Sequence, residues 1–236
     1  MLYPTFWIAE RTATEAQLAP DEAHHALHVL RLGEGTRIGG VDGKGCYVEG
    51  ILKRVGKDTA RLEIEHQVEG WGEPPVETTL ALGLPKHRDR LEWAVEKAVE
   101  LGVTALIPLH TERTERGHFN PQRLTKLLVA ALKQCGRSRL PTLHPPMGVA
   151  QALATTPGAY HLVGWLGATR LIQTHSGAAA GRHVVYWIGP EGDFTPAEMD
   201  FLNHQGAHPV LLGGIRLRTE TAALYCLSWG KAVQGF

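Results

Sequence analysis

After Val76 the pattern of apolar and polar residues changes, and this change restricts the fold more than any other feature of the sequence. Beyond that residue, runs of strand length that are almost wholly apolar alternate with helical stretches. The runs are TTLALGL, TALIPL, YHLVGWL, HVVYWI and HPVLLGG. A strand can be apolar on both faces only where helices cover both sides of its sheet, which is typical of parallel sheets. Residues 77–236 therefore predict an α/β domain built on a parallel sheet.

The first seventy residues instead follow the pattern of short antiparallel strands. The segment TARLEIEHQV alternates apolar with charged residues, as a half-buried strand does. Before it, TRIGGVD and CYVEGILKRV flank a glycine turn at residues 43–45, and a second turn follows at residues 56–58. Closely spaced strands with glycine turns predict a small β-barrel over residues 1–70, and the Gly- and Pro-rich residues 71–76 predict a linker.

Within this first domain, the segment DEAHHALHVLRL predicts a helix with Asp21 as its N-cap. His24 and His28 lie four residues apart on this helix, which is the spacing of a metal-binding pair. The sequence places no third ligand beside them, so packing or RNA contact is the favoured role and we expect no metal site.

Composition excludes several classes of protein. With 43% hydrophobic residues the chain is not disordered throughout. Its 3 cysteines lack C-x-x-C spacing, and no signal-peptide pattern or long apolar run is present, so we expect a cytoplasmic protein.

The net charge of zero conceals a gradient along the chain. Residues 1–76 hold 8 Lys+Arg and 12 Asp+Glu, a net of −4, whereas residues 77–236 hold 16 and 12, a net of +4. Within residues 85–139 the count is 11 against 6, a net of +5. This basic window fits a surface that binds phosphate, although a solvated helical face has the same composition.

Two glycine-bearing turns follow apolar strands in the α/β half, in WIGPEGDFTPAE and LLGGIRLRTETAAL. In the first, Thr195, Pro196 and Glu198 form a capping box for the next helix, and in the second Thr219 is the expected N-cap. Ligands of open α/β sheets bind beyond the carboxyl ends of strands, where these turns lie. By spacing alone the turns fit a ligand site and simple chain reversals equally well.

The G-x-x-x-x-G-K-[ST] and G-x-G-x-x-G fingerprints are absent, which disfavours P-loop and Rossmann nucleotide sites.

The residues of these turns carry a resemblance. IGPEGDFTPAE, followed by LGGIRLRTETA, closely resembles the small-subunit ribosomal RNA uridine-N3 methyltransferase family, within the SPOUT superfamily of knotted methyltransferases. LPKHRDRLEWAVEKAVELGV, AALKQCGRSRLP and HALHVLRLGEGTRI fit the same family, so the match spans almost the whole chain. One departure is Asp193, which stands where the family pattern has a second glycine.

The resemblance implies a trefoil-knotted, parallel-sheet methyltransferase domain preceded by a PUA-like RNA-binding barrel, in a protein that forms a homodimer. It also implies that S-adenosylmethionine binds in the knotted loops. Carried onto this chain, the donor site comprises Leu162, Gly164, Ile188, Gly189, Pro190, Glu191, Gly192, Leu212, Gly213, Ile215, Leu217 and Arg218.

The expected reaction is methylation of N3 of a specific uridine in small-subunit ribosomal RNA, without a metal or a covalent intermediate. We expect Arg218 to steady the uracil or a phosphate, and Glu220 or Glu191 to help remove the N3 proton. A plainer alternative is that Glu220 only begins the last helix. RNA is expected to be held by Lys86, Arg88, Arg90, Arg113, Arg116, Arg137 and Arg139, with Lys53, Arg54 and Lys57 as candidates on the barrel.

Two other functions stay open at this stage. Another SPOUT enzyme would methylate a ribose 2′-hydroxyl or a different base. A non-catalytic, RNA-binding ribosome assembly factor would bind RNA without binding S-adenosylmethionine. The intact IGPEG and LRTETA segments favour the enzyme.

Overall fold

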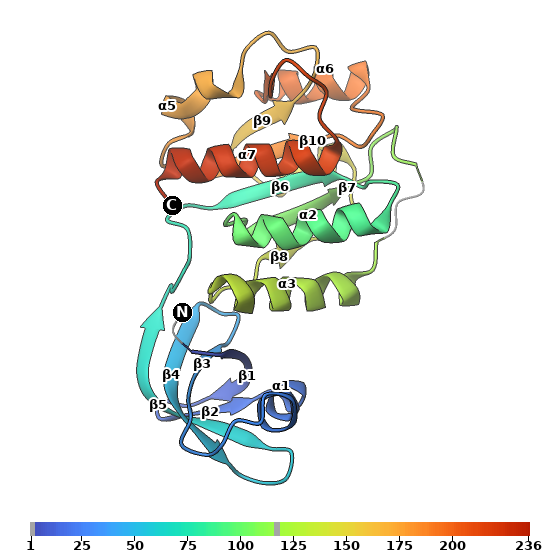
Figure 1. Ribbon diagram of the computed structural model, residues 1–236. Helices are drawn as coiled ribbons and strands as arrows, with labels where there is room; N and C mark the ends of the chain where they lie inside the picture. The colour runs from blue at the N-terminus through green and yellow to red at the C-terminus, as the bar shows by residue number, and fades with distance from the viewer. Residues whose placement is uncertain (1–2, 116–118) are drawn as a thin grey trace. The chain divides into compact units, whose positions relative to one another are not determined.

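The computed structural model describes residues 3–115 and 119–236, which form two compact units (Figure 1). The first unit contains residues 1–73 and 129–140, and the second contains residues 74–128 and 141–236. The chain thus leaves the first unit close to the predicted boundary. It returns to that unit for twelve residues, which the sequence did not lead us to expect.

The returning segment is held by hydrogen bonds to residues just before the boundary. The Glu73 carboxylate accepts hydrogen bonds from the backbone N–H groups of Ser138 and Arg139, at 2.9 and 2.8 Å. The buried Ser138 hydroxyl bonds to the carbonyl oxygens of Gly45 and Trp71. Residues 129–140 are therefore part of the first unit's packing.

The first unit is a closed five-stranded barrel in the order β1-β2-β5-β4-β3, which confirms the predicted barrel. Among the described strands of this barrel, only β1 and β3 pair in parallel. Leu18, Leu52 and Leu62 lie in its apolar core. The strands are β1 (Thr5–Arg11), β2 (Glu15–Leu18), β3 (Arg37–Val41), β4 (Cys46–Arg54) and β5 (Ala60–Glu69).

The helix of the first unit differs from the prediction at its start and in its winding. Helix α1 (Pro20–His24) has Ala19 as its N-cap, so Asp21 lies in the first turn and is not the cap. Pro20 explains the shift, because its fixed φ suits the first helical position. The chain then continues as a π-helix over His25–Val29, labelled η1.

The second unit is built on a six-stranded, wholly parallel sheet in the order β11-β9-β10-β6-β7-β8. The parallel sheet confirms the prediction, whereas the strand order and the short strand β8 were not predicted. The strands are β6 (Thr78–Gly83), β7 (Ala105–Leu109), β8 (Thr142–Leu143), β9 (Tyr160–Gly164), β10 (Val184–Ile188) and β11 (His208–Val210). The helices are α2 (Arg88–Glu100), α4 (Val149–Ala154), the 3₁₀-helix η2 (Ile172–His175), α5 (Ser176–Ala179), α6 (Pro196–His204) and α7 (Thr219–Gln234). Helix α3 (Pro121–Cys135) begins in the second unit and ends in the first.

Central strand β10 explains why the sheet needs cover on both sides. Val185 and Trp187 belong to one apolar core with residues of α4 and α6. The alternate residue Tyr186 meets α7 on the other face, where its ring stands edge-on to Trp229. Helices α2 and α7 lie side by side in front of the sheet (Figure 1). The uninterrupted apolar run of β10 thus fills two layers of core.

Two further expectations concern the chain as a whole. None of the helices seen in the described parts is both long and apolar enough to cross a membrane. The trefoil knot stays a prediction of the resemblance.

The pairing of β4 with β5 generates a test of the barrel. The register shifts between Glu49 and Gly50, and an added Cβ at Gly50 would overlap the backbone carbonyl of Glu63. We expect Gly50→Ala to lower the free energy of unfolding by about 3 kcal/mol, because two backbones must separate. Gly33→Ala is the matched control, since an added Cβ there meets nothing within 4 Å. Urea unfolding measures both variants, and equal stabilities would contradict this account of the barrel.

Candidate active site

A cavity of about 400 Å³ lies in the second unit, beyond the carboxyl ends of three neighbouring strands. Its walls come from the segments after β9, β10 and β11 and from the start of α7. The two glycine-bearing turns therefore meet at one site. The lining residues are Arg90, Gly164, Trp165, Leu166, Ile188, Gly189, Pro190, Glu191, Asp193, Leu211, Leu212, Gly213, Ile215, Arg216, Leu217, Arg218, Thr219 and Ala222.

The two turns are joined by hydrogen bonds. The buried hydroxyl of Thr219 donates to the Gly189 carbonyl oxygen at 3.1 Å, and the Arg216 guanidinium donates to the Glu191 carbonyl oxygen at 3.0 Å. The prediction that Thr219 caps the last helix is wrong, because the N-cap of α7 is Arg218. Thr219 is the first residue of α7, and its hydroxyl is used to hold the neighbouring turn.

Close packing explains two glycines near the cavity, against backbone at one position and against side chains at the other. An added Cβ on Gly83, at the end of β6, would overlap the backbone of Pro190. At Gly164, the last residue of β9, an added Cβ would lie 2.9 Å from Ile188 Cδ1 and 3.2 Å from Leu212 Cδ1. Side chains at these positions would push the strand ends apart or fill the cavity.

The turn after β10 contains the one departure from the family pattern. Asp193 has a φ of +61°, a left-handed conformation that glycine adopts more readily. Its carboxylate accepts a hydrogen bond from the Phe194 backbone N–H at 2.8 Å, which supports this conformation. Burial raises the pKa of the Asp193 carboxyl, while this bond and the charges of Arg216 and Arg113 oppose the shift.

The helix that follows this turn begins as predicted. The Thr195 hydroxyl accepts a hydrogen bond from the Glu198 backbone N–H at 3.3 Å, and the Glu198 carboxylate accepts one from the Thr195 N–H at 2.8 Å. This reciprocal capping box, with Pro196 in the first turn, confirms the prediction. It fixes the direction in which the chain leaves the cavity.

Two carboxylates share one guanidinium at the edge of the site. Arg90 lies 3.5 Å from the Glu191 carboxylate and 3.7 Å from that of Glu220. The Lys86 backbone N–H also donates to both Glu191 oxygens, at 3.2 and 3.4 Å. Glu220 Oε2 is buried and has no hydrogen-bond partner among the described residues. Arg90 is therefore the group that connects the two acidic side chains singled out by sequence.

Most of the residues predicted for a donor site line this cavity. Ten of the twelve do so, all except Leu162 and Gly192. Leu162 is buried within β9, and an added Cβ on Gly192 would meet the Arg113 side chain at 3.1 Å. Of the predicted catalytic residues, Arg218 and Glu191 line the cavity, whereas Glu220 does not.

The predicted donor site includes only part of the cavity lining, and Arg90 was predicted to bind RNA instead. Several missed residues, such as Leu211 and Arg216, are chain neighbours of predicted ones, so continuity along the turns was the signal that could have found them. No comparable sequence signal pointed to Arg90, because it reaches the cavity from α2. The lining residues missed by the donor-site prediction are Arg90, Trp165, Leu166, Asp193, Leu211, Arg216, Thr219 and Ala222.

The predicted RNA-binding residues do not form one set. Lys86, Arg88, Arg90 and Arg113 belong to the second unit, Arg137 and Arg139 belong to the first, and Arg116 lies outside the described residues.

Arg137 requires a correction. Its side chain is only 3% exposed, and its guanidinium forms an ion pair with Glu73 at 2.8 Å. This side chain belongs to the packing of the first unit and is not placed to grip a phosphate. Arg137 was expected to bind phosphate because it lies in a basic segment, but a basic segment does not show which of its side chains are buried.

Three of the remaining basic side chains, those of Lys86, Arg88 and Arg113, are exposed but already partnered. Lys86 pairs with Glu115 at 2.8 Å, and Arg88 pairs with Glu92 at 3.2 Å. The Arg113 guanidinium donates to the Gly192 carbonyl oxygen at 2.9 Å. Surface pairs of this kind contribute little to stability, so phosphate can compete for these cations at small cost.

The barrel candidates have partners of the same kind. Lys53 pairs with Glu63 at 3.2 Å, and Arg54 donates to the carbonyl oxygens of Gly56 and Lys57. Of these contacts only the Lys53–Glu63 pair offsets a positive charge, in keeping with the acidic balance of residues 1–76.

Comparison with known proteins covers both units. A family model described as an RNA methyltransferase domain matches residues 72–231, and one described as an RNA methyltransferase PUA domain matches residues 18–65. Ribosomal RNA small subunit methyltransferase E from Bacillus subtilis is 30% identical over 243 residues, covering 94% of each chain.

Solved structures agree with this match. A ribosomal RNA small subunit methyltransferase E from Neisseria gonorrhoeae, bound to S-adenosylmethionine, superposes with a TM-score of 0.84 at 28% identity and covers 98% of both chains. A Legionella pneumophila putative methyltransferase with the same cofactor superposes with a TM-score of 0.87 at 26% identity and covers 99% of both chains. The chain belongs to the RNA methyltransferase family that includes ribosomal RNA small subunit methyltransferase E, as its two C-terminal motifs predicted.

Proposed function

We propose that this protein transfers a methyl group from S-adenosylmethionine to N3 of a specific uridine in small-subunit ribosomal RNA. The observation that carries the proposal is the meeting of the two family motifs in one cavity, where ten predicted donor-site residues share the wall. Solved relatives that bind S-adenosylmethionine support the choice of donor.

The cavity fits such a donor in size and chemistry. Its volume of about 400 Å³ lies in the usual range for small-molecule sites. Ile188 and Leu212 give it apolar walls, and the glycine turns leave backbone groups within reach of a ligand. Helix α7 begins at the cavity wall and its N-cap residue Arg218 makes no side-chain capping hydrogen bond, and a helix start of this kind suits the carboxylate of the donor. When bound, S-adenosylmethionine supplies an electrophilic methyl group on a sulfonium.

The protein must then position uracil and remove a proton. As the N3–methyl bond forms and the sulfur–methyl bond breaks, the N3 proton must pass to an acceptor. Arg218, on the cavity wall, stabilises the negative charge that develops on the uracil ring. Positioning alone can supply about 7–11 kcal/mol of the barrier reduction.

Geometry separates the two candidate proton acceptors. Glu191 lines the cavity, and its side chain is 42% exposed, so it can reach a bound base. Glu220 is 11% exposed, pairs with Arg90 at 3.7 Å and is not among the residues that line the cavity. We therefore assign proton acceptance to Glu191 and the positioning of Arg90 to Glu220.

The RNA must present an unpaired or splayed-out uridine, because base pairing hides the N3 edge. In this proposal the barrel and the exposed residues Lys86, Arg88 and Arg113 hold the surrounding strand through its phosphates. A substrate of this kind places the protein in the cytoplasm, with the ribosomal subunits.

We also propose that the active form is a homodimer. Ile215 and Leu166 line the cavity, yet they are 76% and 52% exposed, and Leu171, which pairs with the lining residue Leu211, is exposed as well. Exposed apolar side chains at the cavity suit contact with a second copy of the chain.

The primary test incubates the protein with methyl-labelled donor and small-subunit ribosomal RNA, then locates the label by nucleoside mass spectrometry. We expect a single N3-methyluridine. Label on a ribose or on another base would contradict the proposed N3 specificity and would identify a different RNA methyltransferase. RNA binding without donor binding would identify a non-catalytic assembly factor.

Single-turnover and steady-state rates at saturating donor test the residue roles. We expect Arg218→Ala and Glu191→Gln each to lower kcat by about 100-fold or more, because charge stabilisation and proton transfer are lost. Glu220→Gln should cost less than about tenfold, since it acts through Arg90. Arg182→Ala is the control, because Arg182 lies over the Tyr160 ring, at the start of β9 and away from the strand end that lines the cavity. Unchanged kcat in Arg218→Ala or Glu191→Gln would remove that residue from the mechanism.

A further inference from the structure

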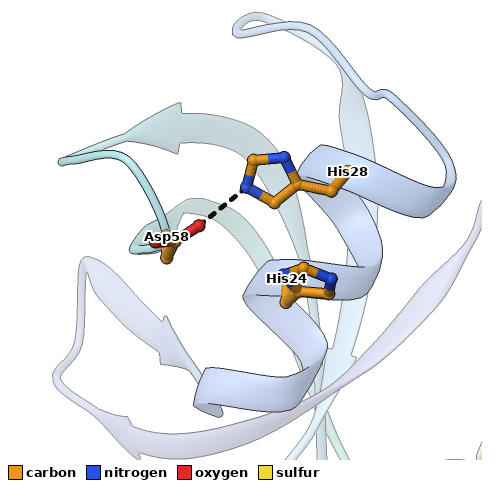
Figure 2. Close-up of side chains that lie close together, drawn as sticks. All are labelled: His24, His28 and Asp58. Atoms are coloured by element: carbon orange, nitrogen blue, oxygen red, sulfur yellow. Dashed lines mark hydrogen bonds and ion pairs between the residues drawn. The ribbon is translucent and has the colours of Figure 1, made fainter.

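Three potential metal ligands gather on the surface of the barrel unit, apart from the proposed active site. His24 ends α1, His28 lies in η1, and Asp58 lies in the turn between β4 and β5 (Figure 2). One ligand atom from each lies within 4.8 Å of the other two. His28 Nε2 and Asp58 Oδ1 are 2.8 Å apart, and the two imidazole rings have centroids 4.8 Å apart. All three side chains are exposed.

The backbone under the histidines has an unusual winding. After α1 the hydrogen bonding widens to that of a π-helix, shown by the bond from the Leu30 N–H to the His25 carbonyl oxygen at 2.9 Å. Single π turns are rare and occur frequently at functional sites. Here the π turn carries His28, whose imidazole hydrogen-bonds to the β4–β5 turn while facing His24 on the turn before (Figure 2).

The ligand set and its spacing suit one type of ion. Two imidazole nitrogens and one carboxylate oxygen are ligands that zinc accepts at about 2.0–2.2 Å, usually in tetrahedral geometry. Tetrahedral ligands at that range lie about 3.4 Å from one another. The observed spread of up to 4.8 Å needs only side-chain rotation to close, which exposed side chains can undergo. An ion would then replace the His28–Asp58 hydrogen bond.

We propose that His24, His28 and Asp58 bind one divalent transition-metal ion of the zinc class, with water at the fourth position. Sequence reasoning expected no metal because it found only the histidine pair. Asp58 is thirty residues away from His28 in the chain and joins the pair through the barrel's topology. The ion ties the helical segment to the β4–β5 turn and so stabilises the first unit. This role is independent of methyl transfer.

The test uses the full chain without a histidine tag, first stripped of metal. Calorimetric titration with Zn²⁺ should give one strong site. Co²⁺ should give a visible absorption band of tetrahedral type, and added Zn²⁺ should raise the melting temperature. We expect His24→Ala, His28→Ala and Asp58→Asn each to weaken Zn²⁺ binding by at least about tenfold.

Two further variants distinguish ligation from a structural hydrogen bond and from unspecific binding. Asp58→His retains a third ligand, so it should bind Zn²⁺ at least as tightly as the original chain. His66→Ala removes an exposed histidine of the same unit outside the cluster and should leave affinity unchanged. The proposal is overturned if the original chain shows no strong site, or if the three cluster variants bind as tightly as His66→Ala.

Discussion

The hydrogen bond from the Thr219 hydroxyl to the Gly189 carbonyl oxygen is the contact on which the proposed active site depends. It is buried and 3.1 Å long, and it joins two turns that are thirty residues apart in the chain. Removing the hydroxyl would leave a buried carbonyl oxygen without this partner, which costs about 1–3 kcal/mol. The first turn presents Glu191 and the second presents Arg218. The other hydrogen bond between the turns, from Arg216 to the Glu191 carbonyl oxygen, is exposed, so both proposed catalytic side chains depend chiefly on the buried one.

Structural features that depend on neighbouring residues could be predicted from the sequence. Features that depend on contacts between residues far apart in the chain could not. The apolar run VVYWI needs two covered faces, so a parallel sheet followed from the alternation of such runs with helical stretches. The Thr195 capping box followed in the same way, because its partner is three residues away. The return of residues 129–140 to the first unit did not follow, since it depends on Glu73 and Gly45. Thr219 was misassigned for the same reason: its partner lies on another turn.

Charge is used differently in the two units. The buried Arg137 pairs with Glu73 and holds a returning segment, whereas Arg90 connects two carboxylates at the edge of a cavity. A basic residue can therefore serve packing, positioning or RNA binding, and its neighbours in sequence do not distinguish these roles. Asp58 shows the same limit, since only the barrel's topology brings it to the histidine pair.

Calorimetric binding of S-adenosylmethionine tests the central claim most directly when Thr219→Val is compared with Thr221→Val. Both substitutions remove a hydroxyl from the first turn of α7, but Thr221 is exposed while Thr219 joins the two turns. We expect Thr219→Val to weaken donor binding by at least about tenfold, as the loss of one buried hydrogen bond implies, and Thr221→Val to leave it unchanged. Equal affinity in the two folded variants would show that the turns form the donor site without this connection, and would contradict the account.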